Sequence, residues 1–168
     1  MLVQLFKILW RFNMRFYFFK CTQDHILTKL RELDPNTSSL DLSYSHLIDR
    51  SGAELVTMTQ LFPQGLRSLD LSWNRLGLKS VQELVAIIKA LPQGLITLDF
   101  SFNHIGSKTD DELIEIFSAF KETSITKMRI ENSISLRPEV WKLLNEILLN
   151  NKEKHSQAEQ SQEPSLMV

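Results

Sequence analysis

Hydrophobic residues recur with a period of about 29 residues through the middle of the chain. Three segments align without a gap and a weaker fourth follows: TSSLDLSYSHL (37–47), LRSLDLSWNRL (66–76), LITLDFSFNHI (95–105) and ITKMRIENSI (125–134). In each segment apolar residues alternate with polar ones, which predicts a short strand with one buried face. Self-similarity at this period is the signature of a solenoid, in which each unit buries its apolar faces against its neighbours.

The residues after each strand predict a helix. Three repeats carry S/T-x-x-E at the same register, with the pairs Ser51/Glu54, Ser80/Glu83 and Thr109/Glu112. This pattern is a capping box, in which the hydroxyl and the carboxylate satisfy free backbone N–H groups at the start of a helix. Apolar residues with helical spacing follow, as in Val81, Leu84, Val85 and Ile88. The runs F-P-Q-G (62–65) and L-P-Q-G (91–94) would end the helices and turn the chain back.

One unit is therefore a strand, a turn, a three-turn helix and a return loop. The fold class that follows is α/β, a right-handed solenoid of about four strand–helix units. Its parallel sheet would form the concave face and its helices the convex face. We expect helical caps at both ends, formed by residues 23–34 and by the helix after Pro138, which bears Trp141.

Composition divides the chain into three regions. Residues 22–150 are periodic and form the repeat domain with its caps, whereas residues 151–168 are polar and are expected to be a disordered tail. Residues 1–20 carry four basic residues, no acidic ones and many large apolar ones. The net charge of −1 gives no field that would favour nucleic acid, and the single cysteine, Cys21, excludes an internal disulfide.

Two interpretations of the N-terminal segment stay open. Lys7, Arg11 and Arg15 are four residues apart, so on a helix they would form one basic face suited to an anionic membrane surface. The alternative function is therefore a membrane-surface adaptor, anchored by residues 1–20. Alternatively, translation starts at Met14 and the preceding residues are not part of the protein. A transmembrane span is disfavoured because each cation at mid-helix costs about 2.5–3.5 kcal/mol.

The motif L-x-x-L-D-L-S-x-N-x-L at 66–76 resembles that of leucine-rich-repeat proteins, and the long unit resembles their ribonuclease-inhibitor-like subclass. The longer motif L-P-Q-G-L-x-x-L-D-F/L-S-F/W-N is similar to that of leucine-rich-repeat effectors of Legionella-type bacteria. This resemblance implies a secreted protein that binds a host protein. The protein would be located in the bacterial cytoplasm before export and in the host cytosol afterwards. The sequence departs from the family at both ends of the asparagine column, which reads Ser45, Asn74, Asn103, Ser133.

The tail carries a second likeness. Glu153, Glu159 and Glu163 precede a hydrophobic end, Leu166–Val168, as in glutamate-rich signals for export by the type IV secretion system. The alternative is an ordinary solvated tail without a function in export.

Binding is expected on the concave face, where the residues between the buried leucines point outward. The candidate residues combine an acidic column, an aromatic column and flanking polar groups: Asp41, Tyr44, Arg67, Ser68, Asp70, Ser72, Trp73, Thr97, Asp99, Ser101, Phe102, Lys127 and Arg129. Aromatic side chains are the usual anchors of protein interfaces. Alternatively, the aspartates and serines only hold the turns, and the aromatic residues only pack beside them.

No catalytic or metal-binding pattern stands out. His46 and His104 lie two repeats apart with Arg75 between them, which is a poor arrangement for a metal. Cys21 has no sequence context typical of a nucleophile, and the five glycines form no phosphate-binding loop. We therefore expect a monomeric binding protein that is not an enzyme and uses no cofactor or metal.

Overall fold

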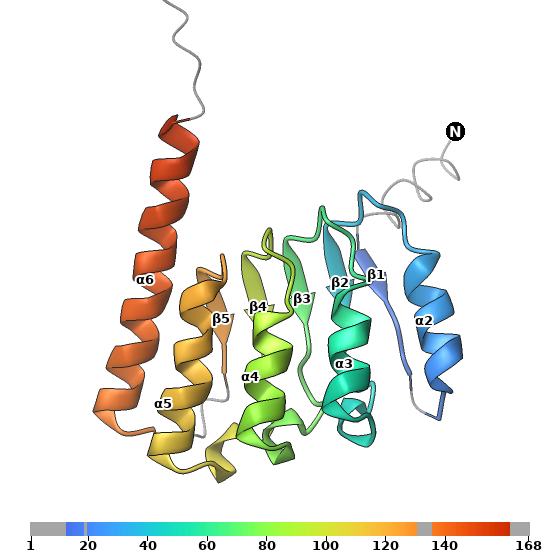
Figure 1. Cartoon of the computed structure of the whole chain (residues 1–168), viewed down its shortest axis with the longest axis horizontal. Coiled ribbons are helices and arrows are strands. Elements are labelled where there is room, and N and C mark those ends of the chain that lie inside the picture. The colour runs from blue at the N-terminus through green and yellow to red at the C-terminus, as the bar shows by residue number, and fades with distance from the viewer. Residues whose placement is uncertain (1–12, 19, 131–135, 162–168) are drawn as a thin grey trace, which may run out of the picture.

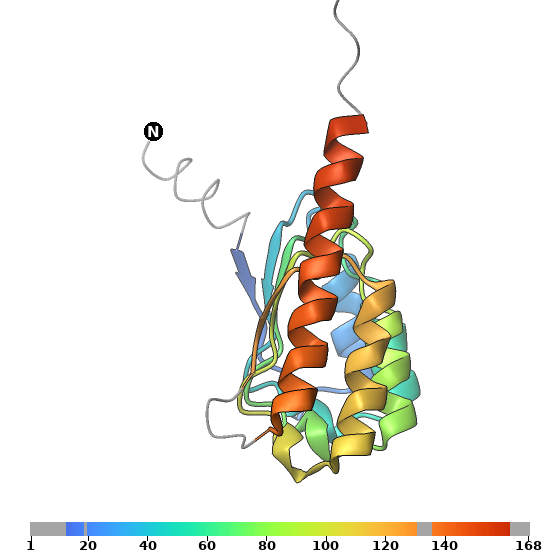
Figure 2. The same ribbon diagram turned by 90° about the vertical axis from the view of Figure 1, so that its left-hand side faces the viewer.

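The computed structural model describes residues 13–18, 20–130 and 136–161, which form two layers, a parallel sheet and a row of helices packed on one of its faces (Figures 1 and 2). The five strands follow chain order across the sheet: β1 (Asn13–Arg15), β2 (Ser39–Asp41), β3 (Ser68–Asp70), β4 (Thr97–Asp99) and β5 (Lys127–Arg129). The helices are α2 (Gln23–Arg31), α3 (Gly52–Thr59), α4 (Val81–Lys89), α5 (Asp110–Ser118) and α6 (Pro138–Ser161). Short 3₁₀ helices complete the units: η1 (Leu47–Asp49), η2 (Leu76–Leu78), η3 (Ile105–Ser107) and η4 (Ala119–Glu122). The predicted strand–helix solenoid is confirmed.

The strand register places equivalent residues of successive repeats side by side. Asp41 pairs with Asp70, and Asp70 pairs with Asp99. The leucines between these polar positions point the other way, and Leu40, Leu69 and Leu98 are buried under the helices. The predicted columns therefore exist on the outer face of the sheet, opposite the helices.

The strand β1 is a correction to the division at residue 20. Residues 1–20 were expected to act as one basic segment, but Asn13–Arg15 forms the edge strand of the sheet, with Met14 opposite Leu40. The repeat search misses this strand because it lacks the leucine motif and precedes β2 by 26 residues rather than 29. Arg15 consequently lies on a strand and does not share a helical face with Lys7 and Arg11, which lie outside the described residues. The alternative start at Met14 stays a prediction.

The three predicted capping boxes are confirmed. In each box the cap hydroxyl accepts from the backbone N–H of the glutamate, and the glutamate carboxylate accepts from the backbone N–H of the cap residue. Glu83 does more, because its Oε1 also accepts from the backbone N–H of Gly52 at 2.9 Å. One carboxylate therefore caps α4 and ties it to the start of α3.

Helix α6 runs to Ser161, well past the other helices (Figure 2). Its apolar side packs on α5, with Val140, Leu144 and Ile147 buried, so the predicted C-terminal helical cap is confirmed. The prediction of a disordered tail from residue 151 is wrong for residues 151–161, which are helical. Lys, Glu, Gln and Ala in this stretch favour continuation of the packed helix. Residues 162–168, including Glu163 and the hydrophobic end, lie outside the described residues. None of the helices that the structure describes is long and apolar enough to cross a membrane.

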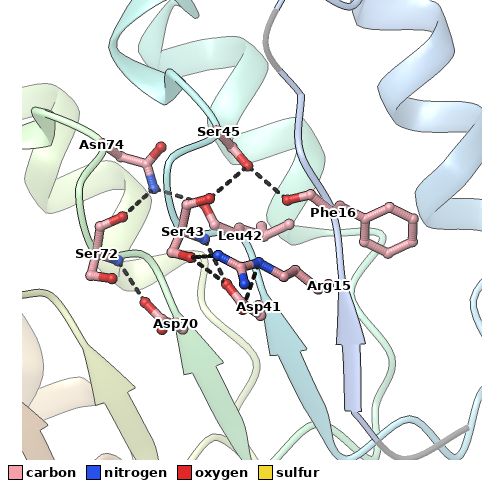
Figure 3. A network of polar contacts seen from close by, with 9 residues as sticks. All are labelled: Arg15, Phe16, Asp41, Leu42, Ser43, Ser45, Asp70, Ser72 and Asn74. Atoms are coloured by element: carbon pink, nitrogen blue, oxygen red, sulfur yellow. Dashed lines mark hydrogen bonds and ion pairs between the residues drawn. The ribbon is translucent and has the colours of Figure 1, made fainter. Parts of the chain in front are cut away.

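Two buried asparagines connect the repeats at the turns after the strands. Asn103 is fully buried, and its Nδ2 donates to the carbonyl of Leu71 in the preceding repeat at 2.8 Å. Its Oδ1 accepts from the backbone N–H groups of Asn74 and Leu76. Asn74 repeats this pattern one unit earlier, donating to the Leu42 carbonyl at 2.8 Å. Ser45, with a shorter side chain, donates to the carbonyl of Phe16 at 3.0 Å (Figure 3). Ser133 lies outside the described residues.

Basic side chains make a second set of links between repeats. The ammonium group of the buried Lys79 donates to the carbonyls of Ile48 and Arg50. Arg50 in turn donates to the carbonyl of Cys21. The units that begin at Thr37 and Leu66 are therefore each bonded to the preceding unit at two separate places.

The capping boxes predict how stability depends on pH. The backbone N–H of each cap residue, donating to the carboxylate, holds the pKa of Glu54, Glu83 and Glu112 below the ordinary value for glutamate. Their contribution to stability is complete above the pKa of the unfolded chain, about 4.3, and is lost as the pH falls through the lower pKa of the folded state. The triple variant E54Q/E83Q/E112Q should lose less unfolding free energy than wild type between pH 6 and pH 3, measured by urea denaturation. Equal losses in the two proteins would contradict this prediction.

Removing a buried asparagine should weaken the solenoid strongly. Asn103→Ala leaves buried carbonyl and N–H groups in two repeats without partners, at about 1–3 kcal/mol for each group left unsatisfied. We expect a loss of about 2–4 kcal/mol in unfolding free energy, measured by urea denaturation at neutral pH. The matched control is Ser45→Ala, which removes one hydroxyl donor and should cost about 1 kcal/mol. Equal losses of unfolding free energy in the two variants would show that the asparagine contributes no more than a single hydroxyl donor.

Candidate protein-binding face

An aromatic column crosses the outer face of the sheet just after strands β2, β3 and β4. Tyr44, Trp73 and Phe102 occupy the same position in successive repeats, and each side chain is between 44% and 46% exposed. The ring centroids of Tyr44 and Trp73 are 5.0 Å apart and those of Trp73 and Phe102 are 4.1 Å apart. The planes differ by only 11° and 15°, so the three rings form one stack.

The backbone conformation directs these rings outward. All three residues have positive φ, from 55° to 60°, which is uncommon for any residue except glycine, asparagine and aspartate. The left-handed conformation costs roughly 1–2 kcal/mol per residue. It persists here because the neighbouring asparagine bonds hold each turn. The same turns also hold His46, Arg75 and His104 at positive φ, so the strain belongs to the turn as a whole. The exposure of the three rings is what makes this column a candidate functional site.

A row of charged residues runs beside the aromatic column. In register across the five strands it reads Arg15, Asp41, Asp70, Asp99 and Arg129. Arg15 Nε lies 3.2 Å from Asp41 Oδ2, and Arg129 lies 3.5 Å from Asp99 Oδ2 (Figure 3 shows the first pair). Within the part of the chain that the structure describes, Asp70 has no ion pair. The predicted acidic column is therefore neutralised at both ends and acidic at its centre.

Each aspartate also holds its turn, as the alternative interpretation proposed. The Oδ1 atoms of Asp41, Asp70 and Asp99 accept from the backbone N–H two residues later, at 2.9, 2.8 and 3.0 Å. Ser43, Ser72 and Ser101 are buried, and the hydroxyls of Ser43 and Ser101 donate to the same Oδ1 atoms. Ser72 and Ser101 therefore support the carboxylates and offer little surface to a partner.

The remaining candidate residues are more dispersed. Ser68, Thr97 and Lys127 form a row on the same face, at the first positions of β3, β4 and β5. The guanidinium of Arg67 donates to the carbonyl of Gly94 in the return loop, away from the aromatic column. Glu131 and Asn132, the equivalents of Ser43 and Tyr44 in the fourth repeat, lie outside the described residues.

Arg15 and Tyr17 are residues of this face that the repeat search misses. Tyr17 follows β1 and is 60% exposed, whereas its neighbours Phe16 and Phe18 stack on each other and pack on the core. The signal for this strand is the alternation of Met14, Phe16 and Phe18 with Arg15 and Tyr17.

The histidines and acidic groups are spread over the molecule. His46 and His104 both occupy left-handed positions that precede 3₁₀ helices, in repeats separated by a whole unit. Among the residues that the structure describes, no three His, Cys, Asp or Glu side chains come together as metal ligands. The face is thus a candidate contact surface, and its described residues form no group of metal ligands.

Comparisons with known proteins identify the fold. A family model described as Leucine Rich repeat matches residues 64–85, and no curated protein matches the chain. The leucine-rich repeat-containing protein LegL7 from Legionella pneumophila is similar over 81% of this chain, with a TM-score of 0.61 and 21% identity. The match covers 53% of that protein, so this chain spans about half its length. The tropomodulin C-terminal domain of Caenorhabditis elegans matches with a TM-score of 0.60 and 13% identity, over 89% of this chain and 88% of that one.

If the aromatic column serves binding, replacing its central ring should cost little stability. Trp73→Asn loses two stacking contacts, at about 0.5–1.5 kcal/mol each, but asparagine tolerates the left-handed backbone better. We expect a net change in unfolding free energy below about 1 kcal/mol, measured by urea denaturation. The reference is Leu69→Ala in the buried core, which should cost about 2–5 kcal/mol. A loss at Trp73 as large as at Leu69 would make the column structural.

Proposed function

We propose that this chain, which has the leucine-rich-repeat fold, is a protein-interaction module that binds a partner protein on the outer face of its sheet. The observation that carries the proposal is the stack of Tyr44, Trp73 and Phe102, exposed on strained backbone beside a row of charges. Aromatic side chains and charged groups placed together are typical of interface hot spots and their surroundings. The chain acts by binding rather than by catalysis, and as a monomer.

The finer proposal is that the protein is a secreted bacterial effector that binds a host protein. Its support is the sequence resemblance to Legionella-type effectors and the likeness in fold to a Legionella pneumophila protein. The protein would occur in the bacterial cytoplasm before export and in the host cytosol afterwards. Export would use the type IV system, with Glu153 and Glu159 of the exposed end of α6 as part of the signal.

The test is capture of partners from host-cell lysate, identified by mass spectrometry. The baits are the wild type and the double variant Asp70→Lys, Trp73→Ser, which reverses the central charge and removes the central ring. A control variant, Asn145→Lys, Leu149→Ser, adds one positive charge and removes one large apolar side chain at exposed positions of α6. Loss of a hot-spot residue costs 2 kcal/mol or more, so we expect at least about tenfold less partner on the sheet-face variant alone.

Melting curves of all three proteins show whether each variant is folded. If the folded sheet-face variant retains its partner at the wild-type level, the partner binds elsewhere and the proposal is contradicted. Loss of the partner from the α6 variant alone would move the interface to the helical side.

A further inference from the structure

We infer that the segment recognised on this face carries a single basic side chain, which pairs with Asp70, next to aliphatic side chains that cover the aromatic column. The inference rests on the proposed function and adds the chemistry of the partner. Three features support it: the ion pairing of each aspartate, the stacking of the aromatic rings, and the distance between the charge row and the aromatic column.

The charge row leaves one carboxylate oxygen for a partner. In Asp41 and Asp99, Oδ1 accepts from the turn N–H, and Oδ2 faces an arginine at the edge of the sheet. In Asp70, Oδ1 makes the same turn bond, but within the described residues no cation faces its Oδ2. The two arginines stand two strands away from β3, roughly 10 Å, so they leave the local potential at Asp70 negative. A second cation of the partner would instead meet a guanidinium group.

The stacking determines what the rings can bind. Trp73 has both faces covered, one by Tyr44 and the other by Phe102. A cation binds an aromatic ring over its face, where the quadrupole is negative, and the edges that remain exposed carry the opposite sign. The column therefore disfavours a basic group or a quaternary ammonium over Trp73 and favours aliphatic side chains against the ring edges. At the centre of the column, the basic group of the partner is thus directed to Asp70.

The distance between the rows limits the spacing on the partner. Trp73 follows Asp70 by three residues, so their Cα atoms are at most about 10 Å apart. A basic residue and an aliphatic residue can bridge that distance when they are within about four positions of each other, in an extended or a helical segment.

A displayed library of random 12-residue peptides, selected on the full-length protein, tests this chemistry. We expect the enriched peptides to share one Lys or Arg within four positions of Leu, Ile, Val or Met. The strongest peptide is then synthesised together with a version in which its basic residue is replaced by Met. Both peptides are titrated against wild type, Asp70→Asn, Trp73→Ser and the α6 control Asn145→Lys, Leu149→Ser.

Asp70→Asn removes the charge and keeps the Oδ1 acceptor for the turn N–H of Ser72, so the local fold is preserved. It should weaken the basic peptide at least about tenfold and leave the Met-substituted peptide unchanged. Trp73→Ser should weaken both peptides, and the α6 control neither.

Three outcomes would overturn the inference. The enriched peptides could lack a basic residue, or no peptide could be enriched at all. The basic peptide could also bind wild type and Asp70→Asn equally well. The proposed function fails separately, when the folded Asp70→Lys, Trp73→Ser protein retains its captured partner.

Discussion

The hydrogen bonds of Asn74 and Asn103 set the geometry on which the rest of the molecule depends. Each amide reaches carbonyls of its own turn and of the preceding one, and each amide oxygen accepts N–H groups that would otherwise be buried without a partner. Buried amide groups tolerate few alternative arrangements, because an unsatisfied group costs as much as a lost hydrogen bond. The strands consequently stay in one register and the turns keep their left-handed residues.

That register turns a local motif into a surface. A single D-L-S-x-N segment places one carboxylate and one aromatic ring beside a strand, and stacked copies place them in rows. The rows differ from a simple repetition at their ends, where Arg15 and Arg129 pair with Asp41 and Asp99. The charge pattern of this face therefore arises from the terminal units, which depart from the repeat, as much as from the repeat itself.

Most of the fold could be predicted from the period of the leucines and from the capping boxes, since both encode local structure directly. Strand β1 and the last turns of α6 could not. Met14 and Phe16 replace the leucines in a shorter unit, and the helix beyond residue 151 depends on the packed turns before it. For the site, the columns followed from alternation, but the pairing of Arg15 with Asp41 required knowledge of β1. The stacking of the rings depends on backbone angles that no residue pattern specifies.

The buried side-chain donors that link the repeats share one direction. The side chains of Asn74, Lys79 and Asn103 donate backward, to carbonyls of the unit before them. A ribosome makes the chain from its N-terminus. The turn carbonyls of a newly made unit therefore lack their side-chain donors until the next unit has been synthesised. Within the described residues the last of these donors is Asn151 of α6, which donates to the carbonyls of Phe120 and Ile125. Completion of the array is thus deferred until the C-terminal helix has left the ribosome.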